Sequence, residues 1–555
     1  MTGDATEVGE GVGDEVRAEV DEPKTLADTL KEKWHRIWHK ELKTLPPYDP
    51  EIHESLTEFE VPEGHTEIER YWLDEPYAFV SVLDDTRMFH YRVVEPSLTT
   101  YEKEILERVY DDLQDVLTLA DTSKADKDAV LTDKTLTLFK RYRASLDVAS
   151  MHKIMYYLHR NFRGYEKINP LLSDPNIEDV SCDGVGVPVF LYHRKYRNIM
   201  TNIVFGELEL NSFVIKMCQK SGKQISIGEP MVDATMSDGS RLQATLGREV
   251  TTRGSSFTIR KFKGDPITPI DLIGFGTCSI DILAYFWLAI ENSKSIIFAG
   301  GTASGKTSIL NAVSLFIPSL AKVITIEDTR ELTLHHENWI AGVTRKSFTG
   351  GTGEVSMYDL LKAALRQRPE YILVGEVRGE EALTLFQAMS TGHTTYSTMH
   401  AGDVQTVVNR LENEPINVPH AMLQSLDIVC IQVQTYVGEV RVRRSNSIVE
   451  VTGLDTRTGN IRINEIYRWN PAADTFKKAG ESYVLNSIMQ SRGWKQDKFI
   501  RELKDRGNIL KYMRGKGMRD YISLSLVVQA YSVNPELVLE AVRNDTLPEM
   551  ISQHR

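Results

Sequence analysis

Residues 295–313 read SIIFAGGTASGKTSILNAV, and this stretch decides the fold of the C-terminal half of the chain. An apolar run at 296–298 leads into the pattern GxxxxGK[ST] at 300–307, and a helical stretch follows. This is the phosphate-binding P-loop pattern in the strand–loop–helix order that it requires. Its glycines let backbone N–H groups turn toward phosphate oxygens, and the helix N-terminus adds partial positive charge.

The P-loop pattern also assigns roles to individual side chains. We expect Lys306 to reach the β- and γ-phosphates of ATP and the Thr307 hydroxyl to ligate Mg²⁺. The alternative, a glycine turn with an idle lysine, is disfavoured by the flanking strand and helix. The expected nucleotide-binding residues are Gly300, Gly301, Thr302, Ala303, Ser304, Gly305, Lys306, Thr307 and Ser308.

Two further apolar runs, 322–328 and 371–376, read as strands that end in acidic residues. Between them Met357, Leu360, Leu361, Ala364 and Leu365 form a helical stripe. Parallel strands with helices between them predict an α/β fold with these acids beside the P-loop, at the edge where ligands bind.

The acids at these strand ends are candidates for the chemistry of hydrolysis. Glu376 is expected to hold Mg²⁺ or its water, and Glu327, Asp328 and Glu331 can face the γ-phosphate to orient the attacking water. One acid in isolation is more often a solvated surface charge. The convergence of three segments on one sheet edge favours the functional interpretation.

Bulk composition limits the class of protein. The 555 residues predict two to four domains, and 41% hydrophobic with 26% charged residues is ordinary for a soluble globular chain. The four cysteines lie far apart, with no CxxC pair, which indicates reduced thiols rather than a zinc site or disulfides. The net charge of −13 argues against non-specific nucleic-acid binding.

The start of the chain has neither a basic nor an apolar signal-peptide region, and the richest apolar run, 282–290, is too short to span a membrane. We therefore expect a cytoplasmic protein with peripheral membrane contact. The pattern predicts a disordered acidic tail at 1–22, a first N-terminal domain at 23–140, a second mixed α/β domain at 141–264, and the ATPase domain with a helical extension at 265–555.

The domain predicted at 23–140 has two recognisable elements. Residues 26–38 form an amphipathic helix with two tryptophans, which either docks on a membrane or partner or packs on its own domain. Residues 77–83 and 87–95 predict a β-hairpin.

Three segments after the P-loop are more specific. IEDTRE at 326–331, ILVGEVRG at 372–379 and STGHTTYSTMHA at 390–401 resemble the aspartate box, Walker B motif and histidine box of the type II/IV secretion ATPase superfamily. That superfamily drives secretion pseudopili, type IV pili and archaella. The resemblance covers roughly residues 165–435.

The resemblance implies a RecA-like C-terminal ATPase domain, mixed α/β N-terminal domains, and a hexamer with ATP bound between the N-terminal and RecA-like domains. It implies Glu331 as the general base and Glu376 as the Walker B acid, with Arg241 and Arg260 as candidates to reach the γ-phosphate. Two histidines, His393 and His400, would sense the nucleotide state; the alternative is a hydrogen-bonded structural role.

The C-terminal segment 451–476 looks like archaeal members, and the tetracysteine zinc element frequent in bacterial members is missing from the sequence. Within the archaeal group the chain resembles the archaellum motor ATPase most, with adhesion-pilus assembly ATPases next. The implied partners are a polytopic membrane platform protein and accessory motor proteins at the cytoplasmic face of the cell membrane. The competing hypotheses are a nucleic-acid motor and a nucleotide-binding scaffold without turnover.

Overall fold

The computed structural model describes residues 44–118, 127–142, 144–262, 264–345, 353–455 and 461–552. The predicted tail at 1–22 and the amphipathic helix at 26–38 lie outside these residues. The chain divides into two compact units, one of residues 1–236 and 242–261 and the other of residues 237–241 and 262–555.

The first unit is built on a nine-stranded sheet in the order β1-β2-β3-β6-β5-β4-β9-β8-β7. Its strands are β1 Thr66–Asp74, β2 Ala78–Asp84, β3 Phe89–Val94, β4 Ile177–Cys182, β5 Pro188–His193, β6 Arg197–Val204, β7 Met231–Thr235, β8 Arg241–Thr245 and β9 Ser256–Arg260. Its helices are α2 Thr100–Thr118, α3 Lys127–Arg141, α4 Val148–Phe162, the 3-10 helix η1 Glu166–Ile168, α5 Asn169–Ser173 and α6 Glu207–Lys220.

The predicted hairpin is present, because β2 and β3 pair antiparallel from Phe79↔Val94 to Asp84↔Phe89. β3 then pairs with β6 in parallel, so strands from both sides of residue 140 share one sheet. The boundary predicted between 23–140 and 141–264 therefore does not divide that sheet. It stays a prediction about folding units.

The second unit contains another nine-stranded sheet, in the order β12-β11-β13-β14-β10-β15-β16-β17-β18. Its strands are β10 Ile296–Gly300, β11 Val323–Glu327, β12 Trp339–Val343, β13 Tyr371–Val374, β14 Thr394–Met399, β15 Ile428–Val437, β16 Val440–Leu454, β17 Ile461–Asn470 and β18 Thr475–Lys478. The six strands from β12 to β15 are parallel, and β16 to β18 continue antiparallel.

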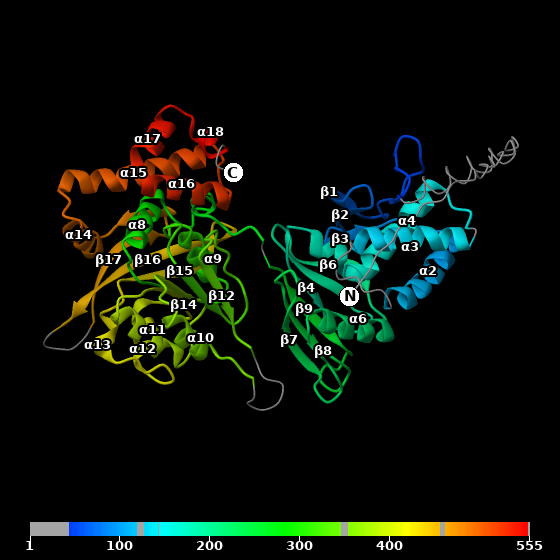
Figure 1. Ribbon diagram of the computed structural model, residues 1–555, viewed down its shortest axis with the longest axis horizontal. Helices are drawn as coiled ribbons and strands as arrows, with labels where there is room; N and C mark the ends of the chain where they lie inside the picture. Colours follow the sequence, from blue (N-terminus) through cyan, green and yellow to red (C-terminus); the bar gives the residue numbers. More distant parts are fainter. Residues whose placement is uncertain are drawn as a thin grey trace, which may run out of the picture. The chain divides into compact units, whose positions relative to one another are not determined.

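Helices cover both faces of the parallel part of this second sheet (Figure 1). Along β10, Ile296 and Phe298 belong to one buried cluster and Ile297 and Ala299 to another, as the two-residue period of a strand requires. The helices are α7 Pro269–Gly274, α8 Ile280–Glu291, α9 Lys306–Ser314, α10 Met357–Leu365, α11 Glu381–Ser390, α12 Val404–Glu412, α13 His420–Leu423, α14 Tyr483–Ser491, α15 Gln496–Gly515, α16 Tyr521–Val533, α17 Pro535–Arg543 and α18 Leu547–Ser552.

The first buried cluster holds α8, α9 and the C-terminal helices, and the second holds α10, α11 and α12. This layered parallel sheet is the RecA-like α/β arrangement that the resemblance implies. The predicted stripe at 357–365 is α10, and the apolar run at 282–290 is the interior of the buried helix α8.

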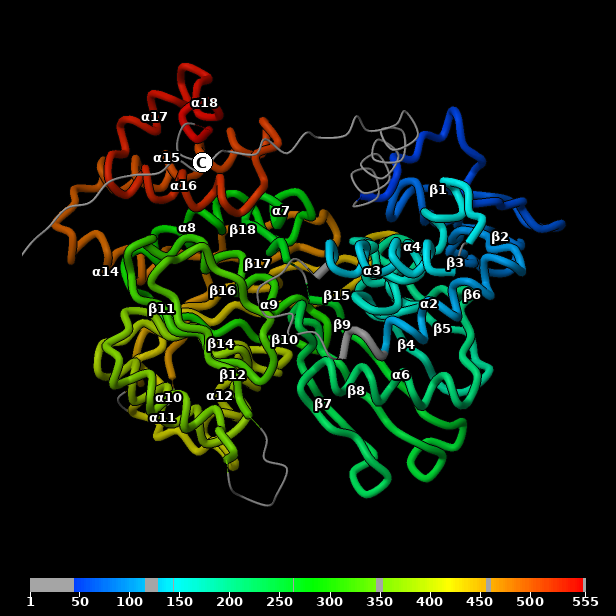
Figure 2. Tube along the Cα trace, turned by 45° about the vertical axis from the view of Figure 1, so that its right-hand side comes forward, coloured from blue at the N-terminus to red at the C-terminus, as the bar shows by residue number. Residues whose placement is uncertain are grey.

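The last four helices form a layer of their own at the end of the chain, gathered together in Figure 2. Arg506 of α15 anchors this layer, because its buried guanidinium pairs with Glu291 at the end of α8 at 2.5 Å and with Glu502 at 2.7 Å. Among the described helices, none combines the length and apolar character needed to cross a bilayer.

Candidate functional site

The P-loop connects β10 to α9 and requires glycine at two points. Gly305 has a φ of +92°, a left-handed conformation that a side chain disfavours. A Cβ atom on Gly300 would lie 2.3 Å from the carbonyl oxygen of Gln432 in β15 and 2.5 Å from Ser304 Oγ. Gly300 therefore permits close packing of the sheet, and Gly305 permits the turn into the helix.

Lys306 is the first residue of α9 and is only 8% exposed. Its Nζ donates to the carbonyl oxygen of Gly301 at 2.9 Å, and the Ser304 hydroxyl donates to the same oxygen at 2.9 Å. Burial lowers the pKa of the Lys306 ammonium, while the charges of Glu376 and Glu331 oppose that shift. Lys306 thus lies within electrostatic reach of both predicted acids.

Glu376 follows β13 and is held by two basic side chains. Its Oε2 accepts from Arg378 Nη2 at 2.5 Å, and its Oε1 lies 3.5 Å from His400 Nε2. The Arg378 Nη1 atom is also 3.8 Å from Asp328 Oδ2, just beyond the end of β11. Arg378 therefore links carboxylates from two neighbouring strand ends.

The sequence prediction did not include Arg378 among the site residues. Arg378 lies in the segment ILVGEVRG, two positions after Glu376, so the sequence could have indicated it. Only the acidic residues of that segment were considered, and the basic side chain that pairs with Glu376 and Asp328 was missed.

Glu327 ends β11 and is 2% exposed. One of its oxygens accepts from the backbone N–H groups of Glu331 at 2.8 Å and Leu332 at 2.9 Å, while Oε2 is buried without a hydrogen-bond partner among the described residues. Burial raises the pKa of this carboxyl to about 7. Glu327 thus shapes the loop that carries Glu331, a supporting role that the sequence did not predict.

The two predicted histidines lie at opposite ends of β14. His400 follows the strand and lies beside Glu376, and its pKa is lowered by burial and then by the charge of Lys306. His393 precedes the strand, where its Nδ1 lies 3.3 Å from Thr391 Oγ1. A strand advances about 3.3 Å per residue, which separates the two on the order of 20 Å. Of the two, only His400 lies beside Glu376.

Arg443 contributes to the P-loop from β16, and the sequence prediction missed it. Its Nε donates to the carbonyl oxygen of Ala303 at 3.0 Å. Because 140 positions separate these residues, no local pattern could indicate the contact. The antiparallel extension of the sheet therefore supports the phosphate-binding loop.

Arg241 begins β8 and Arg260 ends β9, on neighbouring strands of the first sheet. Both are exposed, and Arg260 stands opposite Asp179 of β4 in the strand register. A role for either arginine at the γ-phosphate remains a prediction.

These residues fit a nucleoside triphosphate with Mg²⁺. The left-handed Gly305 and the start of α9 provide backbone donors, Lys306 provides a buried cation, and Thr307 lies in the first turn of the helix. Glu376, whose charge acts on the P-loop lysine, would supply a carboxylate to the metal's coordination sphere. The donor set is that of nucleotide triphosphate chemistry.

Comparison with known proteins agrees with this chemistry. The family model described as type II/IV secretion system protein matches residues 212–483, and models described as PilB3-like, N-terminal and PilB3-like, C-terminal match residues 25–97 and 472–549. An uncharacterised protein of Methanocaldococcus jannaschii is 50% identical over 243 residues, covering 44% of this chain and 90% of that relative.

A second uncharacterised protein of Methanocaldococcus jannaschii is 33% identical over 471 residues, which cover 80% of this chain and 84% of that relative. Among solved structures, the VirB11 ATPase of the Brucella suis type IV secretion system is 24% identical with a TM-score of 0.26. That match covers 50% of this chain and 90% of the VirB11 chain.

Proposed function

The chain belongs to the type II/IV secretion ATPase family, and from this premise we propose that it hydrolyses ATP to drive assembly of a type IV pilus-like filament. The observation that carries the proposal is the P-loop with Lys306 at the start of α9, whose ammonium feels the charges of Glu376 and Glu331. An acid on the loop after β11, in addition to Glu376 after β13, favours hydrolysis over binding alone, because hydrolysis needs a group that orients the attacking water.

Each of these residues has a task in the proposed reaction. Lys306 and the P-loop N–H groups bind and orient the phosphates, and Glu331 accepts the proton of the attacking water. Mg²⁺ would be held by Thr307 and, directly or through water, by Glu376, and would neutralise charge on the phosphates. Arg378 and His400 orient the Glu376 carboxylate through their contacts with its two oxygens.

The proposed working form is a homohexamer at the cytoplasmic face of the membrane, in contact with a polytopic platform protein and accessory motor proteins. Arg241 and Arg260 are proposed to reach the γ-phosphate in that assembly. An arginine in such a position can contribute on the order of 10³-fold or more to the rate.

Two filaments are candidates. The sequence resemblance favours an archaellum, in which the ATPase also powers rotation. The second candidate is an adhesion pilus, whose assembly ATPases the sequence resembles next. Both assign the same chemistry to the site, so the filament must be identified in cells.

The test is the Glu331→Gln variant, with Glu337→Gln as matched control because Glu337 is an exposed acid farther along the same loop. In purified protein we expect Glu331→Gln to lower ATP turnover by about 10²-fold or more while retaining ATP binding. Glu337→Gln should keep wild-type turnover. Unchanged turnover in Glu331→Gln would contradict Glu331 as the general base, and no turnover in the wild type would favour a scaffold.

Electron microscopy of cells whose only copy carries Glu331→Gln then separates the filaments. Loss of archaella alone assigns the archaellum, and loss of thin pili alone assigns the adhesion pilus. Retention of both contradicts filament assembly. Strong, salt-sensitive stimulation of the purified ATPase by DNA or RNA would favour a nucleic-acid motor instead.

A further inference from the structure

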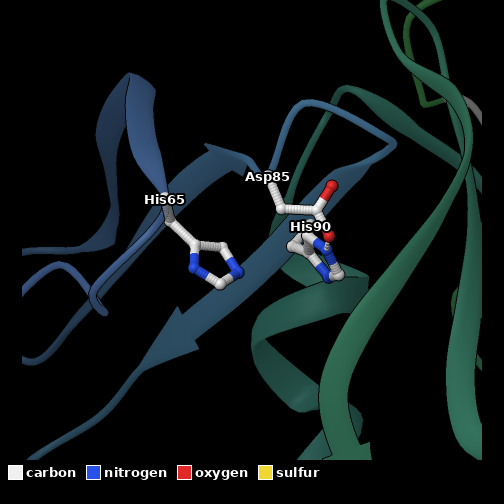
Figure 3. Close-up of side chains that lie close together, drawn as sticks. All are labelled: His65, Asp85 and His90. Atoms are coloured by element: carbon white, nitrogen blue, oxygen red, sulfur yellow. Dashed lines mark hydrogen bonds and ion pairs between the residues drawn. The ribbon is translucent and has the colours of Figure 1, made fainter.

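Three side chains meet at one corner of the first sheet, apart from the residues of the P-loop. His65 immediately precedes β1, Asp85 lies in the turn between β2 and β3, and His90 is on β3. One nitrogen or oxygen atom of each lies within 4.8 Å of the others. Figure 3 shows the ring of His65 beside the Asp85–His90 pair.

The carboxylate of Asp85 is already oriented for a ligand. Its Oδ1 accepts from the backbone N–H groups of Arg87 at 2.9 Å and Met88 at 2.8 Å. Its Oδ2 is left to face His90 Nε2 at 3.0 Å. Hydrogen bonds of this kind fix the ligands of protein metal sites.

His65 is oriented by its own turn. The backbone N–H of His65 donates to the Pro62 carbonyl at 3.1 Å, and Gly64 has a φ of +79°, which permits the reversal. The His65 Nδ1 lies 3.3 Å from the Glu63 carbonyl oxygen. When Nδ1 donates there, Nε2 carries the free lone pair, as in imidazoles that bind metals.

We propose that His65, Asp85 and His90 bind a divalent transition-metal ion, with Zn²⁺ as the ion that fits best. Two imidazole nitrogens and one carboxylate oxygen are ligands for zinc, with water as the fourth, whereas Mg²⁺ and Ca²⁺ take oxygen ligands. Tetrahedral zinc with bonds of about 2.0–2.1 Å needs ligand atoms roughly 3.3 Å apart. The three ligand atoms lie within 4.8 Å of one another, so a movement of about 1.5 Å by His65 is enough to close the site.

The position of the three ligands assigns the ion a structural role. β1 is at the edge of the sheet and pairs with β2, with Thr66 opposite Asp84. A bound ion would join the residue before β1 to the β2–β3 turn and to β3. Because the ion binds the folded state, it stabilises that edge.

The chain offers a matched comparison. His159 Nδ1 lies 3.4 Å from Asp128 Oδ1, a histidine–aspartate pair in the same unit. Within the ranges that the structure describes, only the group at His65 brings three histidine, cysteine or acidic side chains this close together. A two-member pair should not retain zinc at micromolar concentration.

The test is calorimetric titration of full-length protein with ZnCl₂ in saturating Mg²⁺, together with the melting temperature with and without zinc. Wild type should bind one equivalent and gain several degrees in melting temperature. His65→Ala, His90→Ala and Asp85→Asn should each weaken that binding by about tenfold or more and lose the thermal gain. His159→Ala should behave as wild type.

The zinc-free proteins provide the folding control. All four variants should melt near wild type without zinc, because each changed side chain is partly exposed. Co²⁺ in place of Zn²⁺ should give the visible absorption of a four-coordinate site in wild type and not in His65→Ala. Zinc binding by His65→Ala equal to that of wild type would overturn the proposal, as would no zinc-dependent thermal gain in wild type.

Discussion

The carboxyl group of Glu327 is buried at the end of β11, with one oxygen bonded to two backbone N–H groups of the loop that carries Glu331. Such bonds favour the charged carboxylate, but burial favours the neutral acid by more. The pKa therefore rises from its ordinary value of 4.5 to about 7. The residue that shapes the loop of the proposed general base thus titrates near neutral pH.

This pKa predicts a pH dependence of stability. The folded state binds the Glu327 proton more tightly than the unfolded chain, so the free energy of unfolding should fall as pH rises from 4.5 through 7. The loss from this group is about 3 kcal/mol, fully developed above pH 7. Urea denaturation at pH 5 and pH 8 checks it: Glu327→Gln should show a smaller decrease than wild type. Equal decreases would contradict the prediction.

Individual residues of the site show which positions the sequence could predict and which it could not. The roles proposed for Lys306 and Glu376 followed from motif position, and the charge of Glu376 acts on the Lys306 ammonium. Arg378 was within reach of the same reasoning. The same role was predicted for His393 and His400 because both lie in one sequence segment. They lie at opposite ends of β14, which separates them. Motif membership does not tell which end of a strand a residue occupies.

At the scale of elements, the strand–loop–helix at 296–314 depends on a close approach of β10 to β15. The Cβ that Gly300→Ala adds would lie 2.3 Å from a backbone carbonyl oxygen, whereas Gly301→Ala meets nothing within 4 Å. We therefore expect Gly300→Ala to lower the free energy of unfolding by about 1–3 kcal/mol, through overpacking. Gly301→Ala should stay near wild type in stability. Denaturation curves of the two variants check this, and equal curves would contradict it.

The antiparallel extension supplies a second element-scale prediction. The Arg443 bond from β16 to the Ala303 carbonyl holds the P-loop, and a hydrogen bond of this kind is worth about 0.5–1.5 kcal/mol. Arg443→Ala should therefore weaken ATP binding by about two- to tenfold, measured with a fluorescent ATP analogue. The control is Arg441→Ala on the same strand, because Arg441 contacts Gln434 and not the P-loop. Equal affinities in both variants would contradict the role of Arg443.

The sequence could predict β10, β11, β13 and the helix between the last two because each is a short apolar run or stripe next to a motif. It could not predict that β16 reaches the P-loop, since that contact depends on long-range strand pairing. The boundary predicted at residue 140 falls in the chain between β3 and β6, which pair in one sheet, and it stays a prediction about folding units. Local patterns define elements, whereas sheet order depends on tertiary packing.

At the scale of the whole molecule, the net charge of −13 and the family membership point the same way. An acidic chain gains little from phosphate contacts, which disfavours the hypothesis of a nucleic-acid motor.

Assembly supplies the last prediction. Light scattering with Mg²⁺ and a non-hydrolysable ATP analogue should give the mass of six copies of the 62.9 kDa chain, about 377 kDa. Lys306→Ala should form smaller species under the same conditions. The ATP analogue stabilises the assembled state by binding to it, and this variant lacks the lysine that binds the phosphates. Glu331→Gln, which retains ATP binding, should form the large species with ATP itself. A mass of 62.9 kDa for wild type at every protein and nucleotide concentration would exclude the hexamer, and with it the roles proposed for Arg241 and Arg260.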